Sequence, residues 1–258
     1  MSDYSFVPGS QSATLTFKAE LKGSGTAGTA PAIGKLLKAC GCGETVVAVT
    51  SVTYAPISTA VPSLTMALFR DGVKKQMRGA RGTVKIVTKV GEPAMLEFEF
   101  KGVYDGVTDV ALLAGTGIES TIPPALLAAS LTVQSLAMKI SALSMDFTNK
   151  LALRTDISKA EGYFSCLLTD RDIKGSLDPE HERVATHNFY GIFKAGTLAS
   201  MSLAIGATGG NICTITAPKV QYMRLAEGDR DGILTLGLDI ALTRSATTGD
   251  DEIGIAFT

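Results

Sequence analysis

Apolar and polar residues alternate along many short stretches of this chain, and this period of two is the feature that most constrains its fold. Within residues 13–22, Leu15 and Phe17 fall on one side of an extended backbone, whereas Thr16 and Lys18 fall on the other. Such alternation is typical of antiparallel strands that bury one face and expose the other. We therefore expect a mostly β protein. The same pattern recurs over residues 46–54, 64–69, 83–90, 95–104, 140–147, 163–168, 201–205, 212–216 and 233–244.

Two stretches carry the signals of a helix instead. Residues 31–39 begin with a proline and are followed by Gly41, and residues 186–194 precede Gly196. Proline is favoured in the first turn of a helix and glycine just past its last turn. We expect one short helix in each half of the chain.

The two halves of the chain resemble each other. Ser63-Leu-Thr-Met-Ala-Leu and Ser200-Met-Ser-Leu-Ala-Ile begin 137 positions apart (200 − 63), and Pro123-Pro124 lies near the midpoint of the chain. Similar segments at a long offset indicate an internal repeat. We predict two tandem β-sandwich or barrel-forming domains, the first over residues 1–119 and the second over 135–258, joined by a linker containing proline and alanine over 120–134.

The charge balance excludes a strongly basic nucleic-acid binder. The 258 residues include 24 Lys and Arg against 25 Asp and Glu, so the net charge is −1. Only 19% of the residues are charged and the mean hydropathy is +0.24, which is apolar for a chain of this length. Because large exposed apolar surfaces are commonly covered by partners, we expect this protein to assemble with itself.

Nothing in the sequence predicts a membrane span, a secretory signal or a metal site. Residues 120–138 carry no charge, but two prolines and six polar side chains interrupt them. The chain does not begin with a basic segment followed by an apolar run. Cys40 and Cys42 lack the spacing of a zinc pair. We expect reduced thiols at Cys40, Cys42, Cys166 and Cys213, and no metal or cofactor.

Residues 23–28 have the glycine spacing of a dinucleotide-binding loop, and Glu44 follows about twenty residues later. The strand expected before this loop alternates, however, whereas the first strand of a nucleotide-binding sheet is buried on both faces. A flexible loop is therefore the simpler interpretation, and a nucleotide-binding enzyme is kept as an alternative.

The two histidines do not indicate catalysis. His181 lies among carboxylates, as in a solvated loop, and His187 opens the second expected helix, where it can cap or pack. No nucleophile motif accompanies either of them. We predict no catalytic, cofactor-binding or metal-binding residue, and hence no enzyme.

Two charged segments are candidates for contacts between subunits. One is a basic, glycine-containing segment between two expected strands, for which a solvated hairpin loop and a nucleic-acid contact are the alternatives. The other is an acidic turn before the last long strand. Loops of opposite charge on one molecule suit head-to-tail stacking of identical copies. The suspected contact residues are Arg70, Lys74, Lys75, Arg78 and Arg81 in the basic segment and Asp229, Arg230 and Asp231 in the acidic turn.

Several segments, taken in order, resemble the major tail tube proteins of long-tailed, non-contractile bacteriophages. The resemblance covers most of the chain and lies in the succession of its segments, with no single diagnostic motif. In the first half it is carried by the small-residue loop and helix of residues 25–41. In the second half it is carried by residues 140–149, 154–158, 161–163, 169–178, 228–244 and 249–257.

This resemblance implies paired β-sheets flanked by a helix, which close side by side into rings that stack into a tube. With two fused domains, three chains supply the six units of a ring, so a trimeric, pseudo-sixfold ring is expected rather than a hexameric one. The implied partners are further copies, the tape-measure, tail-tip and tail-terminator proteins, and genome DNA, which passes through the lumen without sequence-specific binding. The implied location is the virion, after assembly in the host bacterial cytoplasm and without a membrane.

A binding module of a different class is the main alternative. A β-sandwich that presents loops for adhesion would share the strand pattern. It would bind sugars through exposed aromatic side chains, and the chain contains no tryptophan.

Overall fold

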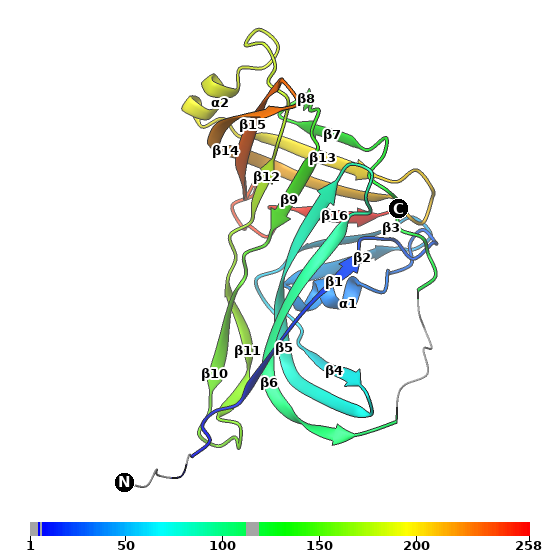
Figure 1. Ribbon diagram of the computed structural model, residues 1–258, viewed down its shortest axis with the longest axis vertical. Helices are drawn as coiled ribbons and strands as arrows, with labels where there is room; N and C mark the ends of the chain where they lie inside the picture. Colours follow the sequence, from blue (N-terminus) through cyan, green and yellow to red (C-terminus); the bar gives the residue numbers. More distant parts are fainter. Residues whose placement is uncertain (1–4, 6, 112–118) are drawn as a thin grey trace.

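The computed structural model describes residues 5, 7–111 and 119–258, which form sixteen strands and two short helices (Figure 1). The expectation of a mostly β protein is confirmed. Most of the first six residues, which bear on the expected absence of a secretory signal, and residues 112–118, near the end of the predicted first domain, lie outside the described residues.

Seven strands form the long layer of the molecule, and most of them run lengthwise in Figure 1. Every neighbouring pair in this layer is antiparallel. The layer buries one face because apolar residues occupy every second position, including Phe98, Phe100 and Met145. Its order is β1 (Ser12–Glu20), β6 (Met95–Asp109), β5 (Val73–Lys89), β9 (Ala142–Asp146), β12 (Lys174–Leu177), β15 (Ile233–Thr243) and β14 (Cys213–Arg230).

A second layer crosses behind the upper part of the first (Figure 1). Strand β14 belongs to both layers, because its residues 219–230 pair with β15 and its residues 213–220 pair with β13. Apolar side chains of the two layers and of the first helix form one continuous core. The other strands of this layer are β13 (Ala199–Ile205), β16 (Gly254–Phe257), β3 (Ser51–Pro56), β2 (Cys42–Val47), β7 (Ser130–Val133) and β8 (Leu136–Ala137).

Both predicted helices are present and slightly shorter than expected. Helix α1 (Gly34–Ala39) buries Leu37 in the core. Helix α2 (Phe189–Ala195) begins where the side chain of Asn188 accepts a hydrogen bond from the Gly191 amide, and it ends at Gly196 in the left-handed conformation. An asparagine cap and a terminal glycine are the usual ways to satisfy free backbone groups at helix ends.

Two hairpins extend the lower part of the molecule in Figure 1. Strand β4 (Leu64–Arg70) pairs with the first half of β5 through a two-residue turn. Strands β10 (Lys150–Thr155) and β11 (Tyr163–Asp170) form a separate two-stranded sheet. Arg78 on β5 holds this sheet in place, since its guanidinium lies 2.6 Å from the Glu161 carboxylate.

The same arrangement of elements occurs once in each half of the chain. In the first half, β4, β5, β6 and β1 are neighbours in that order, and α1 lies between β1 and β4 in the sequence. In the second half, β13, β14, β15 and β12 are neighbours in that order, and α2 lies between β12 and β13. The two units share one sheet, because β9 pairs with β5 on one side and with β12 on the other.

Three details of the sequence prediction were wrong. Residues 46–54 form the β2–β3 hairpin and not one strand, because the chain turns at residues 48–50, where Val49 has a φ of 63°. The basic segment is not a loop: only Asp71 and Gly72 form the turn, and Lys74 to Arg81 lie on β5. The acidic turn is likewise shorter than expected, since Asp229 and Arg230 lie on β14.

Candidate interaction surface

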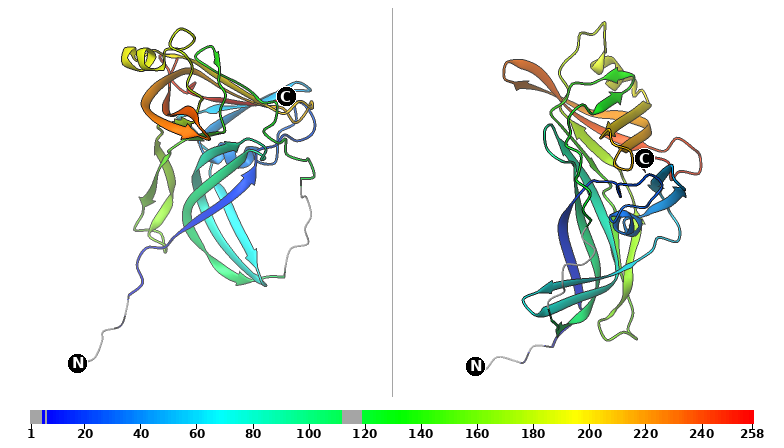
Figure 2. Two further views of the ribbon diagram at one scale, coloured as in Figure 1. Left: turned by 45° about the horizontal axis from the view of Figure 1, so that its top comes forward. Right: turned by 90° about the vertical axis from the view of Figure 1, so that its right-hand side faces the viewer.

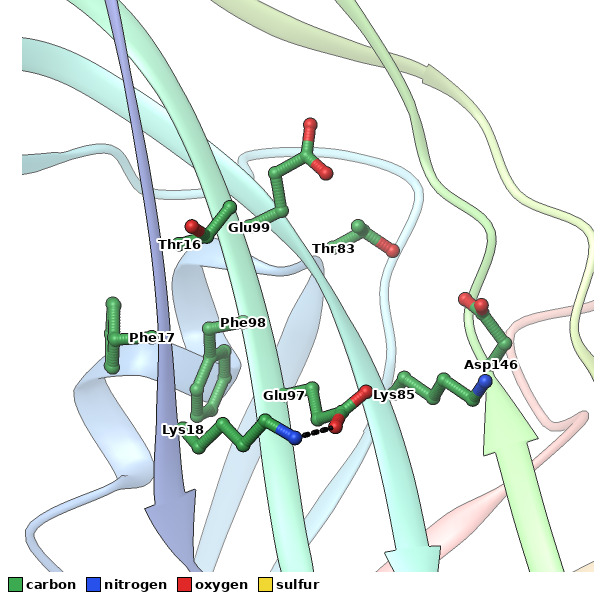
Figure 3. A pocket seen from close by; sticks show the side chains of 9 residues that line it. All are labelled: Thr16, Phe17, Lys18, Thr83, Lys85, Glu97, Phe98, Glu99 and Asp146. Atoms are coloured by element: carbon green, nitrogen blue, oxygen red, sulfur yellow. Dashed lines mark ion pairs between the residues drawn. The ribbon is translucent and has the colours of Figure 1, made fainter.

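The outward face of the long layer is polar and hollowed (Figure 3). Because side chains alternate along each strand, the residues opposite the buried core project from β1, β6, β5 and β9 into an open hollow of about 540 Å³. The polar residues that line this hollow are Thr16, Lys18, Thr83, Lys85, Glu97, Glu99 and Asp146.

One row of charges crosses this face at right angles to the strands. The strand register places Lys18 opposite Glu97, Glu97 opposite Lys85, Lys85 opposite Asp146, and Asp146 opposite Lys174. The sign therefore alternates at each step across five strands. We call these five residues the charged row. Directly opposed residues of unlike charge attract each other across a sheet.

One ion pair lies within the charged row, and the lysine at its far end contacts a carboxylate outside the row. The Lys18 ammonium lies 2.5 Å from the Glu97 carboxylate, and Lys174 lies 2.5 Å from Asp172. The hydrogen bond from Lys18, with the nearby positive charge of Lys85, holds the pKa of Glu97 below its ordinary value. Because these groups are exposed, the pairs contribute little to stability, and their main effect is on the electrostatic field above the face.

Both ends of the long layer are open. Among the described residues, β1 pairs only with β6, and residues 221–230 of β14 pair only with β15. Six antiparallel steps separate β1 from β14, so these two edges run in the same direction. Met223, on the β14 edge, is 52% exposed. Long open edges are places where a second chain can add its own strand.

The predicted basic contact residues divide into two groups. Arg70, Lys74 and Lys75 lie at the β4–β5 end, and none of them forms an ion pair with another described residue. Arg78 and Arg81 are instead used within the chain. Arg78 contacts Glu161, and Arg81 donates hydrogen bonds to the carbonyl oxygens of Val61 and Cys166.

The predicted acidic contact residues lie at the tip of the β14–β15 hairpin. The Arg230 guanidinium is held by Asp178 at 3.1 Å and by Glu180 at 3.2 Å. Asp229 and Asp231 are exposed. The structure therefore places the predicted residues in two separate clusters. The β4–β5 turn and the β14–β15 hairpin lie towards opposite ends of the long axis (Figure 1), and both project to the same side in the right-hand view of Figure 2.

In the glycine-rich loop of residues 23–28, two backbone amides donate hydrogen bonds to a neighbouring loop of the same chain. The Gly23 amide donates to the side-chain oxygen of Asn211 at 2.8 Å, and the Gly25 amide donates to the carbonyl oxygen of Gly210 at 3.1 Å. A Cβ atom on Gly23 would lie 2.1 Å from that carbonyl oxygen of Gly210. The glycines thus allow two backbones to approach closely, and these amides are not free to bind a phosphate.

The histidines belong to an aromatic cluster beside α2. His187 is 8% exposed, and its Nε2 lies 3.1 Å from the Tyr222 hydroxyl. Burial lowers its pKa below the ordinary value. The His181 ring lies 6.0 Å from the rings of Phe189 and Tyr190, measured between centroids. Over the described part of the chain, no cluster of three or more potential metal ligands occurs.

The four cysteines are buried and free, and burial raises the pKa of Cys42 and of Cys213 to about 12. Neither helix in the described ranges is long and apolar enough to cross a bilayer.

Comparison with known proteins returned no match among the models of protein families or among curated protein sequences. The function must therefore be inferred from the chain itself.

The charged row was not predicted from the sequence. Alternation predicts that Lys18, Lys85 and Glu97 face away from the core, and that signal was available. It does not give the pairing register between strands that lie far apart in the sequence, and only the register brings these charges into one line.

Proposed function

We propose that this chain is a structural subunit of the tail tube of a long-tailed bacteriophage, and that its copies close into stacked rings around a conduit for DNA. The observation that carries the proposal is the long layer, which has one polar face and two open edges that run in the same direction. A repeated side-by-side contact between such edges removes both of them and produces a closed barrel.

The repeated arrangement of elements supports a ring of three chains. The β1-β6-β5 group of the first half and the β12-β15-β14 group of the second half already lie side by side in one sheet, with β9 between them. A neighbouring chain would continue this series at the β14 edge. Three chains would then supply six similar units, which favours a trimer over a hexamer.

The two hairpin ends support stacking of rings. Translation of one copy along the long axis brings the β4–β5 end, with Arg70, Lys74 and Lys75, towards the β14–β15 tip, with Asp229 and Asp231. In such a tube the further partners would be tape-measure, tail-tip and tail-terminator proteins, and the location would be the virion.

The proposal is tested by negative-stain electron microscopy of the purified protein over a concentration series, with the mass measured in parallel by light scattering. We expect rings or tubes and a mass that corresponds to three chains per ring. A protein that stays monomeric at every concentration would contradict self-assembly.

The stacking contact is tested by charge reversal. Removal of residues 74–81 is not a clean test, because this segment includes the buried residues Met77 and Ala80 of β5. The variant Lys74→Glu/Lys75→Glu should form rings that do not stack, and mixing it with Asp229→Lys/Asp231→Lys should restore tubes. The control is Lys35→Glu/Lys194→Glu, which makes the same change of charge at exposed positions on the two helices. Tubes of normal length from the first variant would contradict the assignment.

A further inference from the structure

The charged row runs from the β1 edge to β12 across the polar face, and the proposed stacking contacts do not include its residues. Its five residues come from five neighbouring strands, so Lys18, Lys85 and Lys174 are separated by two strands each. With neighbouring strands about 4.8 Å apart, these lysines lie about 10 Å from one another. Without carboxylates between them, they would form a basic stripe across the face.

The carboxylates between the lysines remove this stripe. Glu97 lies between Lys18 and Lys85 (Figure 3), and the strand register places Asp146 between Lys85 and Lys174. The direct contact between Lys18 and Glu97, at 2.5 Å, also lowers the pKa of this carboxylate.

The positions around the row add one further carboxylate, the exposed Glu99, and several hydroxyl groups. Thr16 and Thr83 line the same hollow, and Ser144 and Ser176 continue the face towards β12. Further along, Arg224 lies opposite Asp239. The face is therefore wet and rich in hydroxyl groups, with its positive charges compensated locally.

We propose that this face allows double-stranded DNA to pass in contact with it without being held, and that Glu97 and Asp146 are the residues that prevent retention. This rests on the proposed function, which supplies the DNA. A lysine that contacts a phosphate releases a counterion and adds affinity, so Lys18 and Lys85 would bind the DNA backbone together if they lacked their carboxylates. A lysine already neutralised by a carboxylate gains much less from such a contact.

The test is a gain of binding. In the double variant Glu97→Gln/Asp146→Asn, both side chains keep their shape. The side-chain amide oxygen that replaces the carboxylate of Asp146 can still accept the hydrogen bond donated by the Thr148 amide. Binding of a labelled DNA duplex is followed by fluorescence anisotropy from 50 to 200 mM salt, at protein concentrations below assembly. We expect affinity at least about tenfold higher than that of the unchanged protein at 50 mM salt. Lys174 keeps its contact with Asp172 in this variant, so two lysines are released and we expect a salt dependence steeper by about two in log–log slope.

The matched control is Asp156→Asn/Asp170→Asn on the β10–β11 hairpin. It makes the same change of net charge and also releases basic residues, because Asp170 lies 2.7 Å from Lys150 and Asp156 lies near Lys159 and Arg154. We expect this control to gain less affinity than the double variant, because the cations that it releases lie outside the polar face. An equal gain of affinity for DNA in both variants would show that net charge alone determines binding, which would overturn the proposal. No gain of affinity in either variant would also overturn it. Tight binding by the unchanged protein would overturn it as well.

The same samples are examined by electron microscopy, which separates this inference from the proposed function. Glu97 and Asp146 lie on β6 and β9, away from both open edges, so the variant should form the same rings. Absence of rings in the unchanged protein counts against the tail-tube proposal. Rings with no gain of DNA binding in the variant count against the role of the charged row alone.

Discussion

The two repeated units of this chain differ most in the segment that connects the helix to the next strand. In the second unit α2 leads to β13 after residues 196–198, whereas in the first unit residues 40–63 separate α1 from β4 and include the β2–β3 hairpin. Strand β3 pairs with β16 near the end of the chain. The hairpin found only in the first unit therefore binds that unit to the second, and the two units share one core.

The helices themselves are fixed in a similar way by different chemistry. Near α1, the hydroxyl of the buried Tyr54 donates to the Glu44 carboxylate at 2.7 Å, and Lys38 contacts the same carboxylate at 2.9 Å. Near α2, the hydroxyl of the buried Tyr222 contacts His187. One unit thus depends on a carboxylate and the other on an imidazole, and these groups titrate in different pH ranges.

The largest expected effect comes from the strand that joins the units. Met145 on β9 is 0% exposed, so Met145→Ala should leave a cavity and lower the free energy of unfolding by about 3 kcal/mol. Met201→Ala, at an equally buried site on β13 of the second unit, should have a similar effect. Because the core is shared, urea unfolding of both variants should remain one transition by fluorescence and by circular dichroism. Separate transitions for the two halves would show that the units fold independently.

A smaller loss of stability should distinguish Arg171 from Arg230. Arg171 is nearly buried and contacts Asp250 at 2.9 Å and Glu252 at 3.3 Å, and it also donates to the Ile57 carbonyl oxygen of the first unit. Arg171→Met should cost about 2 kcal/mol, because it leaves two carboxylates without their partner and breaks a contact between the units.

The comparison for Arg171 is Arg230→Met, within the second unit. Arg230 is more exposed and also has two carboxylate partners, so its loss should cost about 1 kcal/mol. The free energy of unfolding in urea measures both changes. Equal losses would contradict a special role for the contact between the units.

The smallest effects should appear in the pH dependence of stability. Burial lowers the pKa of His187 in the folded state, so the unfolded chain binds a proton first as the pH falls. The free energy of unfolding should therefore decline from about pH 7 towards pH 5. The variant His187→Gln should lose this pH dependence.

The first unit should respond at lower pH. The hydrogen bond from Lys38, with that from Tyr54, lowers the pKa of Glu44, so its contribution is present above the unfolded pKa and is lost as the pH falls below about 4.5. The variant Glu44→Gln should lose the pH dependence of stability only in this lower pH range. Unfolding curves at a series of pH values measure both, and a single variant that changes both ranges would contradict the assignment to separate units.

The sequence was sufficient for features that depend on neighbouring residues. Alternation located most strands, and the terminal glycine located α2. The Asp71-Gly72 pair, a known signal for a tight hairpin turn, could also have shown that the basic segment is strand and not loop. The turn at Val49 gave no such signal, because a β-branched residue with positive φ is uncommon and the alternation continues through it.

The features that the sequence could not supply depend on residues far apart in the chain. Lys85 and Asp146 are opposed only because β9 inserts between β5 and β12. The role of Gly23 depends in the same way on the backbone at Gly210. Neither relation leaves a local pattern, because each is set by how complete strands and loops meet in the folded core.

Six antiparallel strand pairings lie between the two open edges, β1 and β14, and this number affects any assembly in which these edges pair. Because that number is even, a parallel pairing of β14 with β1 of the next copy makes each added copy point the same way as the last, and the two ends of such an assembly are chemically unlike. The Lys74 side and the Asp229 side then face different surroundings at its two extremities. In such an assembly, the component that starts growth would bind one of these two surfaces, and the component that stops growth would bind the other.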